Sequence, residues 1–355
     1  MDVRTLEALG DTPQPLQPEP FHRGVLTIDA AAETARIIEY LRGSVLQKLG
    51  RRGAVVGVSG GVDSSVTLAL AALAFGPERV VPLLLQEKES SPDNAVLVRE
   101  LCRRLDLEPR VEEITGALEG FGCYRRRDEA IRRVFPEFDS TYRAKITLPG
   151  DLLNHDALTL FALTIVSPEG EAHSRRLPPA ECREIVAATN FKQRTRMALL
   201  YHHAELRHYA VLGTANRNER MQGFFVKYGD GAADIDTIVH LYKTQVYQMA
   251  EHLGIPEGIQ RRLPTTDTYS APTTEEEFFF RMSFETMDLL WYAQEHGVAI
   301  EEAAAVMNLA PRQVERAYRE FRRKHRATSY LRAPILALDE RSRGRAEQPG
   351  WSTRG

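Results

Sequence analysis

Residues 55–73 read "VVGVSGGVDSSVTLALAAL" and change character twice within a few positions. The apolar run from Ala54 to Val58 predicts a buried strand, and the alanine- and leucine-rich part predicts a helix over residues 64–75. Between them lie two glycines, several serines and one carboxylate. A loop that joins a buried strand to a helix presents backbone N–H groups and the positive end of the helix dipole. The stretch therefore predicts an anion-binding site.

The residue types of this loop narrow the choice of anion. Gly60 and Gly61 let the backbone approach a ligand closely. Hydroxyl donors are supplied by Ser59, Ser64 and Ser65. Asp63 would repel a phosphate unless a cation lay between them, so the pattern indicates a magnesium-bound polyphosphate. A Walker A loop is excluded because no lysine follows the glycines, and the glycine spacing excludes a GxGxxG dinucleotide motif. A glycine turn that only links a strand to a helix is the alternative.

The alternation of strands and helices continues outward from this unit. Further strands are predicted over 79–85, 110–114 and 208–213, and further helices over 29–49, 91–107, 191–207 and 242–253. Continuous apolar strands that alternate with helices are typical of a parallel sheet covered on both faces. The predicted fold class is therefore α/β, with a Rossmann-like twisted parallel sheet and helices on both of its faces.

Residues 121–187 interrupt this alternation and are predicted to form an inserted segment. Its first part, "YRRRDEAIRRVFPEF", predicts a short basic helix, and "ALTLFALTIVSPEGEAHSRRL" predicts a hairpin that turns at Pro168–Gly170. The chain ends in a helical part over about 273–335. We expect a single domain over 25–335, a proline-rich tail at 1–24 and a flexible tail at 336–355.

The bulk composition excludes several classes of protein. A net charge of −3 provides no field that would attract nucleic acid or a membrane to the whole surface. No run reaches the roughly 20 apolar residues of a membrane span, and the N-terminus has no apolar signal segment. The three cysteines form no CxxC pair, which argues for a reducing compartment. A cytoplasmic protein with no nucleic-acid or membrane partner is expected.

Six further sequence blocks follow the glycine loop along the chain. They are "NFKQRTRM" (190–197), "VLGTANRNE" (211–219), "GFFVKYGDGAAD" (223–234), "LYKTQVYQMAEHLGIP" (241–256), "LPTTD" (263–267) and "RKHR" (323–326) followed by Pro334. Together with the SGGVDSS loop, they resemble the NAD synthetase family of the ATP pyrophosphatase superfamily, in its ammonia-dependent type. The resemblance covers roughly residues 30–120 and 188–335 and implies an adenine nucleotide α-hydrolase-like fold.

The resemblance implies an ATP-dependent amide ligase. Such an enzyme adenylates a carboxylate, releases pyrophosphate, and lets ammonia displace AMP; the implied acceptor is nicotinate adenine dinucleotide (deamido-NAD). It also implies roles for individual residues. The predicted ATP-binding residues are Ser59, Gly60, Gly61, Asp63, Ser64, Ser65, Leu85, Thr214, Lys243 and Thr265. The predicted acceptor-binding residues are Asn190, Arg194, Lys227 and Asp234, and the predicted catalytic residues are Asp63, Lys243 and Asp230.

Two carboxylates are predicted to hold the magnesium ion, Asp63 and Glu219. Glu219 follows the strand that ends at Gly213, and this edge of an open α/β sheet is where ligands bind. Magnesium is typically held by one or two carboxylates together with phosphate oxygens. A solvated surface glutamate is the alternative for Glu219.

The predicted partners are small molecules and a second copy of the chain. No cysteine-nucleophile glutaminase or nitrilase-like domain fits beside this core in 355 residues, so ammonia must be free or come from a separate protein. A homodimer is expected because the family places the acceptor site across two subunits.

Several features depart from the pattern of the family. They are Ala215 in "GTANRNE", Ala232 in "DGAAD", the aromatic residues 278–284 and the length of the inserted segment. A different acceptor carboxylate is therefore the first alternative, and a non-catalytic nucleotide sensor is the second. The apolar hairpin predicts a packing partner in Phe278–Phe280, which would make the inserted segment a lid over the acceptor. A structural flap at the dimer edge is the alternative.

Overall fold

The computed structural model describes residues 20–154, 161–265 and 268–336. Its central sheet has five strands in the order β3-β2-β1-β7-β8, and every pair of neighbours is parallel. The strands are β1 (Ala54–Gly57), β2 (Val80–Gln86), β3 (Arg110–Glu113), β7 (Ala210–Gly213) and β8 (Ile235–Asp236). Because β1 lies in the middle, the loop that follows it lies at the centre of the carboxyl edge of the sheet.

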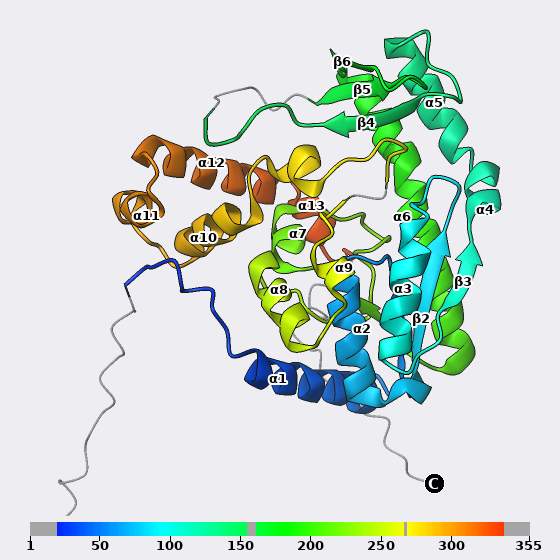
Figure 1. Ribbon diagram of the computed structural model, residues 1–355, viewed down its shortest axis with the longest axis vertical. Coiled ribbons are helices and arrows are strands. Elements are labelled where there is room, and N and C mark those ends of the chain that lie inside the picture. The colour runs from blue at the N-terminus through cyan, green and yellow to red at the C-terminus, as the bar shows by residue number, and fades with distance from the viewer. Residues whose placement is uncertain (1–19, 155–160, 266–267, 337–355) are drawn as a thin grey trace, which may run out of the picture.

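Helices cover both faces of this sheet (Figure 1). Alternate residues of β1 point to opposite faces, and each face has its own hydrophobic cluster. Val56 packs with α1 (Ala30–Arg42), α2 (Val62–Phe75), α3 (Asp93–Arg104) and α8 (Lys243–His252). Val55 packs with α4 (Thr115–Gly120), α5 (Cys123–Val134) and α6 (Pro179–Arg207). The predicted fold class, a parallel sheet with helices on both faces, is confirmed.

The largest difference from the predicted elements is the start of α6. The sequence predicts a helix over 191–207, whereas α6 is 29 residues long and begins at Pro179. Proline is favoured in the first turn of a helix, where its missing N–H leaves no hydrogen bond unmade. The first three turns of α6 therefore belong to the stretch that was assigned to the inserted segment.

The inserted segment carries a second sheet at one end of α6 (Figure 1). Its three antiparallel strands are β4 (Arg143–Thr147), β5 (Ala162–Val166) and β6 (Ala172–Arg176), with β5 in the middle. β5 and β6 form a hairpin, as the sequence predicts, and Gly170 in its turn has a φ of +90°. The strand β4 was not predicted, because it is short and its residues are mixed in polarity.

The C-terminal part is helical and packs to the side of α8 (Figure 1). It contains η3 (Glu276–Phe280), α10 (Phe284–Glu295), α11 (Ile300–Met307), α12 (Pro311–Ala327) and α13 (Ser329–Arg332). Phe21 and Leu26 are buried in the same hydrophobic cluster as these helices. The remaining elements are η1 (Gly43–Lys48), η2 (Pro77–Arg79), α7 (Arg217–Gln222) and α9 (Glu257–Gln260).

The predicted tails lie almost entirely outside the described residues, which begin at residue 20 and end at residue 336. Within the described ranges, every helix is too short or too polar to cross a lipid bilayer.

Candidate active site

A cavity of about 740 Å³ opens at the carboxyl edge of the central sheet, where the strands β1, β2 and β7 end. Its walls come from the glycine loop, α6, the turn after β7, the start of α8 and residues within 262–265 and 268–279. Most of the predicted site residues line it. These are Ser59, Gly61, Asp63, Ser64, Leu85, Asn190, Arg194, Thr214, Glu219, Lys227, Asp230, Lys243 and Thr265. Most of the predicted ATP-binding residues therefore share one cavity with three of the four predicted acceptor-binding residues.

The glycine loop is held by its own serines. Gly60 has a φ of +79°, in the left-handed region where a side chain would be strained. Ser65 Oγ donates to the carbonyl oxygen of Gly61 at 2.8 Å, and Ser64 Oγ donates to the same oxygen at 3.1 Å. Ser65 is fully buried, and neither it nor Gly60 lines the cavity. Gly60 and Ser65 therefore fix the shape of the loop, while Ser59 and Gly61 face the cavity.

Asp63 lies in the first turn of α2 and is held by two partners. Asn216 Nδ2 donates to Asp63 Oδ1 at 2.9 Å, and Lys243 Nζ donates to Asp63 Oδ2. Lys243 is fully buried at the start of α8, and Glu275 Oε2 lies 3.8 Å from its Nζ. Burial opposes the charge of Lys243, but Asp63, Glu275 and Glu219 together raise its pKa above the ordinary value. Lys243 therefore stays a cation inside the cavity.

Glu219 completes a group of three neighbouring carboxylates. It lies in α7, and its Oε2 accepts a hydrogen bond from Asn216 N at 3.0 Å in a capping box. Burial raises the pKa of Glu219 well above its ordinary value, and the charges of Asp63 and Glu275 add to the effect. Burial likewise raises the pKa of Glu275 to about 7, although Lys243 acts in the opposite direction. One lysine therefore faces three carboxylates.

This excess of negative charge suits a hard divalent cation. Glu275 Oε2 is buried and has no hydrogen-bond partner among the residues that the structure describes. Oxygen ligands from carboxylates are those that magnesium prefers, and the ion usually keeps several ligands from water or phosphate. Within the described ranges, no three His, Cys, Asp or Glu side chains converge as a ready ligand set. The residues present therefore fit an ion that takes most of its ligands from a bound phosphate.

The predicted acceptor residues are partly engaged with one another. Arg194 Nε donates to the carbonyl oxygen of Lys227 at 3.3 Å. Lys227 Nζ in turn donates to the carbonyl oxygens of Tyr330 and Ala333, at 2.9 and 3.1 Å. Asp234 does not line the cavity, because its carboxylate accepts hydrogen bonds from Val211 N at 2.8 Å and Tyr201 Oη at 3.1 Å. In this structure Asp234 joins β7 to α6.

Asp230 is a buried carboxylate on the wall of the cavity. Its Oδ1 accepts a hydrogen bond from Val226 N at 2.9 Å, and burial raises its pKa to about 6. At pH 7 the side chain is therefore mostly ionised, but its ionised form is less stable than that of an exposed aspartate.

The raised pKa of Asp230 predicts a pH-dependent stability change in the Asp230→Asn variant. Wild-type stability falls as pH rises from the ordinary pKa of 3.8 to the folded value of about 6. The variant avoids this loss and keeps an oxygen for Val226 N. We expect its free energy of unfolding to exceed that of the wild type by on the order of 3 kcal/mol at pH 8 and by about half of that at pH 5. Urea unfolding at both pH values measures the difference in free energy of unfolding between the variant and the wild type. An equal difference at pH 5 and pH 8 would contradict the prediction.

Sequence reasoning missed Asn216 and Glu275. Asn216 lies inside the quoted block "VLGTANRNE", so its position was a usable signal. Glu275 belongs to the run "TTEEEFFF", where nothing in the sequence separates a buried glutamate from two solvated ones. Only packing beside Lys243 distinguishes it.

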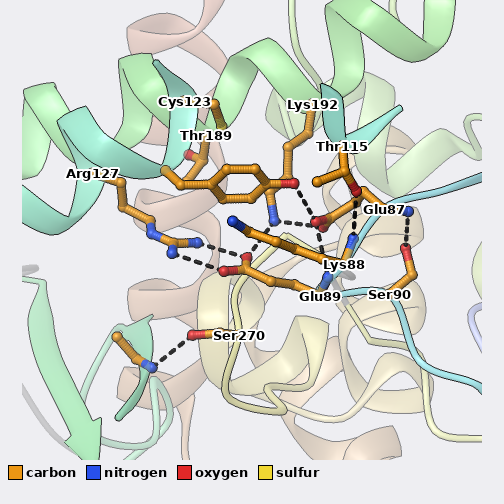
Figure 2. A network of polar contacts seen from close by, with 12 residues as sticks. Glu87, Lys88, Glu89, Ser90, Thr115, Cys123, Arg127, Thr189, Lys192 and Ser270 are labelled. Carbon is orange, nitrogen blue, oxygen red and sulfur yellow. Dashed lines mark hydrogen bonds and ion pairs between the residues drawn. The ribbon is translucent and has the colours of Figure 1, made fainter. Parts of the chain in front are cut away.

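A buried charge network beside the cavity was also missed (Figure 2). Lys192 Nζ lies 2.7 Å from both Glu87 Oε1 and Glu89 Oε2. Arg127 holds Glu89 with two hydrogen bonds of 2.6 and 2.8 Å, and Tyr124 Oη donates to Glu87 at 2.7 Å. Burial alone would raise the pKa of Glu89, but Arg127 and Lys192 lower it to about 2. This charge network (Tyr124, Arg127, Lys192, Glu87 and Glu89) joins α5, α6 and the end of β2. The signal for it was a pair of acids directly after a buried strand.

Comparisons with known proteins agree with this arrangement. The model of the family described as NAD synthase matches residues 33–136 and 164–328. An NH(3)-dependent NAD(+) synthetase of Mesorhizobium japonicum is 46% identical over 316 residues, which are 89% of this chain and 99% of the relative. The protein of that name from Thermotoga neapolitana is 36% identical over 292 residues, 82% of this chain and 92% of the relative.

Solved structures resemble the fold. The structure of an NH3-dependent NAD synthetase from Campylobacter jejuni matches with a TM-score of 0.57 and 20% identity, over 88% of this chain and all of that chain. An NMN synthetase from Francisella tularensis matches with a TM-score of 0.55 and 21% identity, over 88% of this chain and 99% of that chain. The resemblance noted in the sequence blocks is therefore confirmed, and the chain belongs to the NAD synthase family.

Proposed function

We propose that the protein is an ATP-dependent ligase that converts deamido-NAD to NAD with ammonia, releasing AMP and pyrophosphate. The observation that carries this proposal is that the glycine loop lines the same cavity as three of the predicted acceptor residues, Asn190, Arg194 and Lys227. A reaction between two bound substrates requires such a shared space. The names of the relatives, NH(3)-dependent NAD(+) synthetases, support the same activity.

The proposed reaction has two steps, because a carboxylate is a poor electrophile. In the first step, a carboxylate oxygen of the acceptor attacks the α-phosphorus of ATP, and the bond to pyrophosphate breaks. In the second step, the nitrogen of ammonia attacks the acyl carbon, and the bond to AMP breaks. Each step therefore ends in the departure of a phosphate group that carries negative charge.

The residues at the glycine loop act on that charge. The backbone of Gly61 and the hydroxyl of Ser59 face the cavity at the start of α2, where N–H groups point at a bound anion. Lys243 is held as a cation by its three acidic neighbours and can transfer its hydrogen bonds from Asp63 to a phosphate oxygen. Asp63 and Glu219 would hold a magnesium ion, which supplies positive charge against the leaving pyrophosphate.

The acceptor side must bind a dinucleotide and receive a proton. Arg194 and Lys227 would neutralise its phosphates, and Asn190 would supply a polar contact. Asp230 would accept a proton from ammonium, because a buried carboxylate with a pKa of about 6 is a stronger base than an exposed one. The homodimer and the cytoplasmic location stay predictions.

One observation favours a different acceptor carboxylate as the second candidate. Phe161 and Val186, which lie within the inserted segment as predicted from the sequence, line the cavity on the acceptor side. A wall of this kind changes the shape and polarity of the acceptor pocket. The substrate must therefore be identified by experiment among several acids.

The test is a screen of acceptor acids with ATP, magnesium and ammonium, in which AMP and pyrophosphate are measured. We expect deamido-NAD to support product formation, and we expect the rate at fixed total ammonium to rise with pH through the alkaline range as neutral ammonia becomes abundant. Glutamine in place of ammonium is the control and should give no product. Efficient use of glutamine by the purified chain would contradict the assignment. A protein that binds ATP but forms no AMP with any acid would be a nucleotide sensor.

A further inference from the structure

One side of the active-site cavity is aromatic. Among the rings that line the cavity, we call four the aromatic wall: Phe161, Tyr269, Phe278 and Phe279. The ring centroids of Phe161 and Phe278 are 6.4 Å apart, and those of Tyr269 and Phe278 are 5.4 Å apart. Phe224, on the turn after α7, stacks on Phe279 at 5.0 Å. Tyr269 interacts with the side chain of Thr189, which lines the cavity beside the predicted acceptor residue Asn190, so the rings lie on the acceptor side.

The aromatic wall is attached to the small sheet of the inserted segment. Two backbone hydrogen bonds join them, from Ala271 N to the Ala144 oxygen at 3.0 Å and from Leu148 N to the Glu277 oxygen at 3.1 Å. Ala144 N also donates to Ser270 Oγ at 2.9 Å (Figure 2). The strand β4 therefore holds segment 268–280 in place, while the residue before β5, Phe161, contributes a ring of its own.

The inserted segment is in turn fixed to the central sheet by the charge network. Arg127 of α5 reaches Glu89, which follows β2, and Lys192 of α6 binds the same carboxylate (Figure 2). The side chains of Arg127 and Lys192 are 6% and 1% exposed, so water screens these contacts little. Residues close to this junction, among them Gln86 and Asn190, line the cavity. The aromatic wall is therefore part of a rigid frame around the site.

We propose that this aromatic wall excludes water from the acyl-adenylate, which deepens the proposed function and rests on it. Water is the competing nucleophile in the second step. If its oxygen attacks the acyl carbon, the bond to AMP breaks and the original acid returns, so ATP is spent without amide formation. A mostly aromatic surface offers few hydrogen-bond partners to water and suppresses this path. The aromatic wall thus sets how many ATP molecules are consumed for each amide formed.

The test compares aromatic-wall variants with a buried phenylalanine elsewhere in the inserted segment. Phe161→Ala and Phe278→Ala open the wall, and Phe161→Leu and Phe278→Leu are milder versions if the alanine variants fail to fold. Phe138→Leu is the control, because Phe138 is buried in the same hydrophobic cluster but does not line the cavity. The ratio of AMP to amide is measured at limiting ammonium, in water enriched in heavy oxygen.

We expect about one AMP per amide in the wild type and in Phe138→Leu, and a ratio several-fold higher in the variants of the aromatic wall. The heavy oxygen should appear in the recovered acceptor acid. Folded wall variants with an unchanged ratio, or with no label in the acid, would overturn the role in water exclusion and leave the proposed function standing. A wild type that forms no AMP with any acid would overturn the proposed function, and this proposal with it.

Discussion

The variant Asp63→Asn is expected to lose pyrophosphate release, by on the order of a thousandfold or more, while its fold stays intact. The substitution keeps the shape of the side chain and leaves an oxygen for Asn216 Nδ2, which donates to Asp63 Oδ1 at 2.9 Å. It removes the charge that would hold magnesium and the negative partner of Lys243. Pyrophosphate release with ATP, magnesium, deamido-NAD and ammonium measures the loss, and circular dichroism checks the fold.

Two further variants test whether the loss is specific to the metal carboxylates. Asp93→Asn is the matched control, since Asp93 is an exposed aspartate in the first turn of α3 and does not line the cavity. Glu219→Gln should behave like Asp63→Asn if both carboxylates hold one ion. Both active-site variants should then need more magnesium for any residual activity. Normal turnover by Asp63→Asn would contradict the metal assignment.

The variant Lys192→Met is expected to destabilise the protein by about 3–5 kcal/mol, because it removes the cation that two buried carboxylates share. Lys192 Nζ is 2.7 Å from an oxygen of each glutamate, and the side chain of Glu87 is fully buried. Methionine fills nearly the same volume, so packing changes little and the loss reports on charge. The midpoint and slope of urea unfolding at pH 7 give the free energy of unfolding.

Lys88→Met is the control for this prediction. Lys88 pairs with Glu119, but their side chains are 47% and 57% exposed, and such pairs contribute about 1 kcal/mol or less. Glu89 keeps its two hydrogen bonds to Arg127 in the Lys192→Met variant, so Glu87 is the carboxylate left without a cation. Adding Glu87→Gln to Lys192→Met removes that unpaired charge and should recover part of the lost stability. Equal losses in Lys192→Met and Lys88→Met would show that the charge network does not stabilise the fold.

Local patterns in the sequence were enough for the glycine loop and the type of fold. A buried strand, a turn that requires a positive φ at Gly60 and an apolar helix follow within 22 residues, so neighbours in the chain specify the structure. The same holds for the β5–β6 hairpin, whose turn at Pro168–Gly170 lies between an apolar strand and a polar strand. In both cases the local sequence pattern identifies the element, although β1 makes its hydrogen bonds to β2 and β7.

The start of α6 and the strand β4 could not be predicted from such patterns. In the first turns of α6, up to Asn190, only Ile185, Ala188 and Thr189 are buried, too few positions to show a helical stripe in the sequence. The strand β4 has a mixed sequence and becomes a strand because β5 offers it a hydrogen-bonding edge. For these two elements, contacts with other parts of the chain outweigh local preference.

The residue types of the glycine loop indicated an anion site with a metal carboxylate at Asp63, because that chemistry depends on a few residues close together in the chain. The partners of Asp63 and the charge network depend on tertiary packing. Lys243 lies 180 residues from Asp63, and Lys192 lies 105 residues from Glu87. A charged residue has the same sequence signature whether it is solvated or buried. Its burial beside a distant partner, which sets its pKa and its effect on stability, follows only from how the helices pack on the sheet.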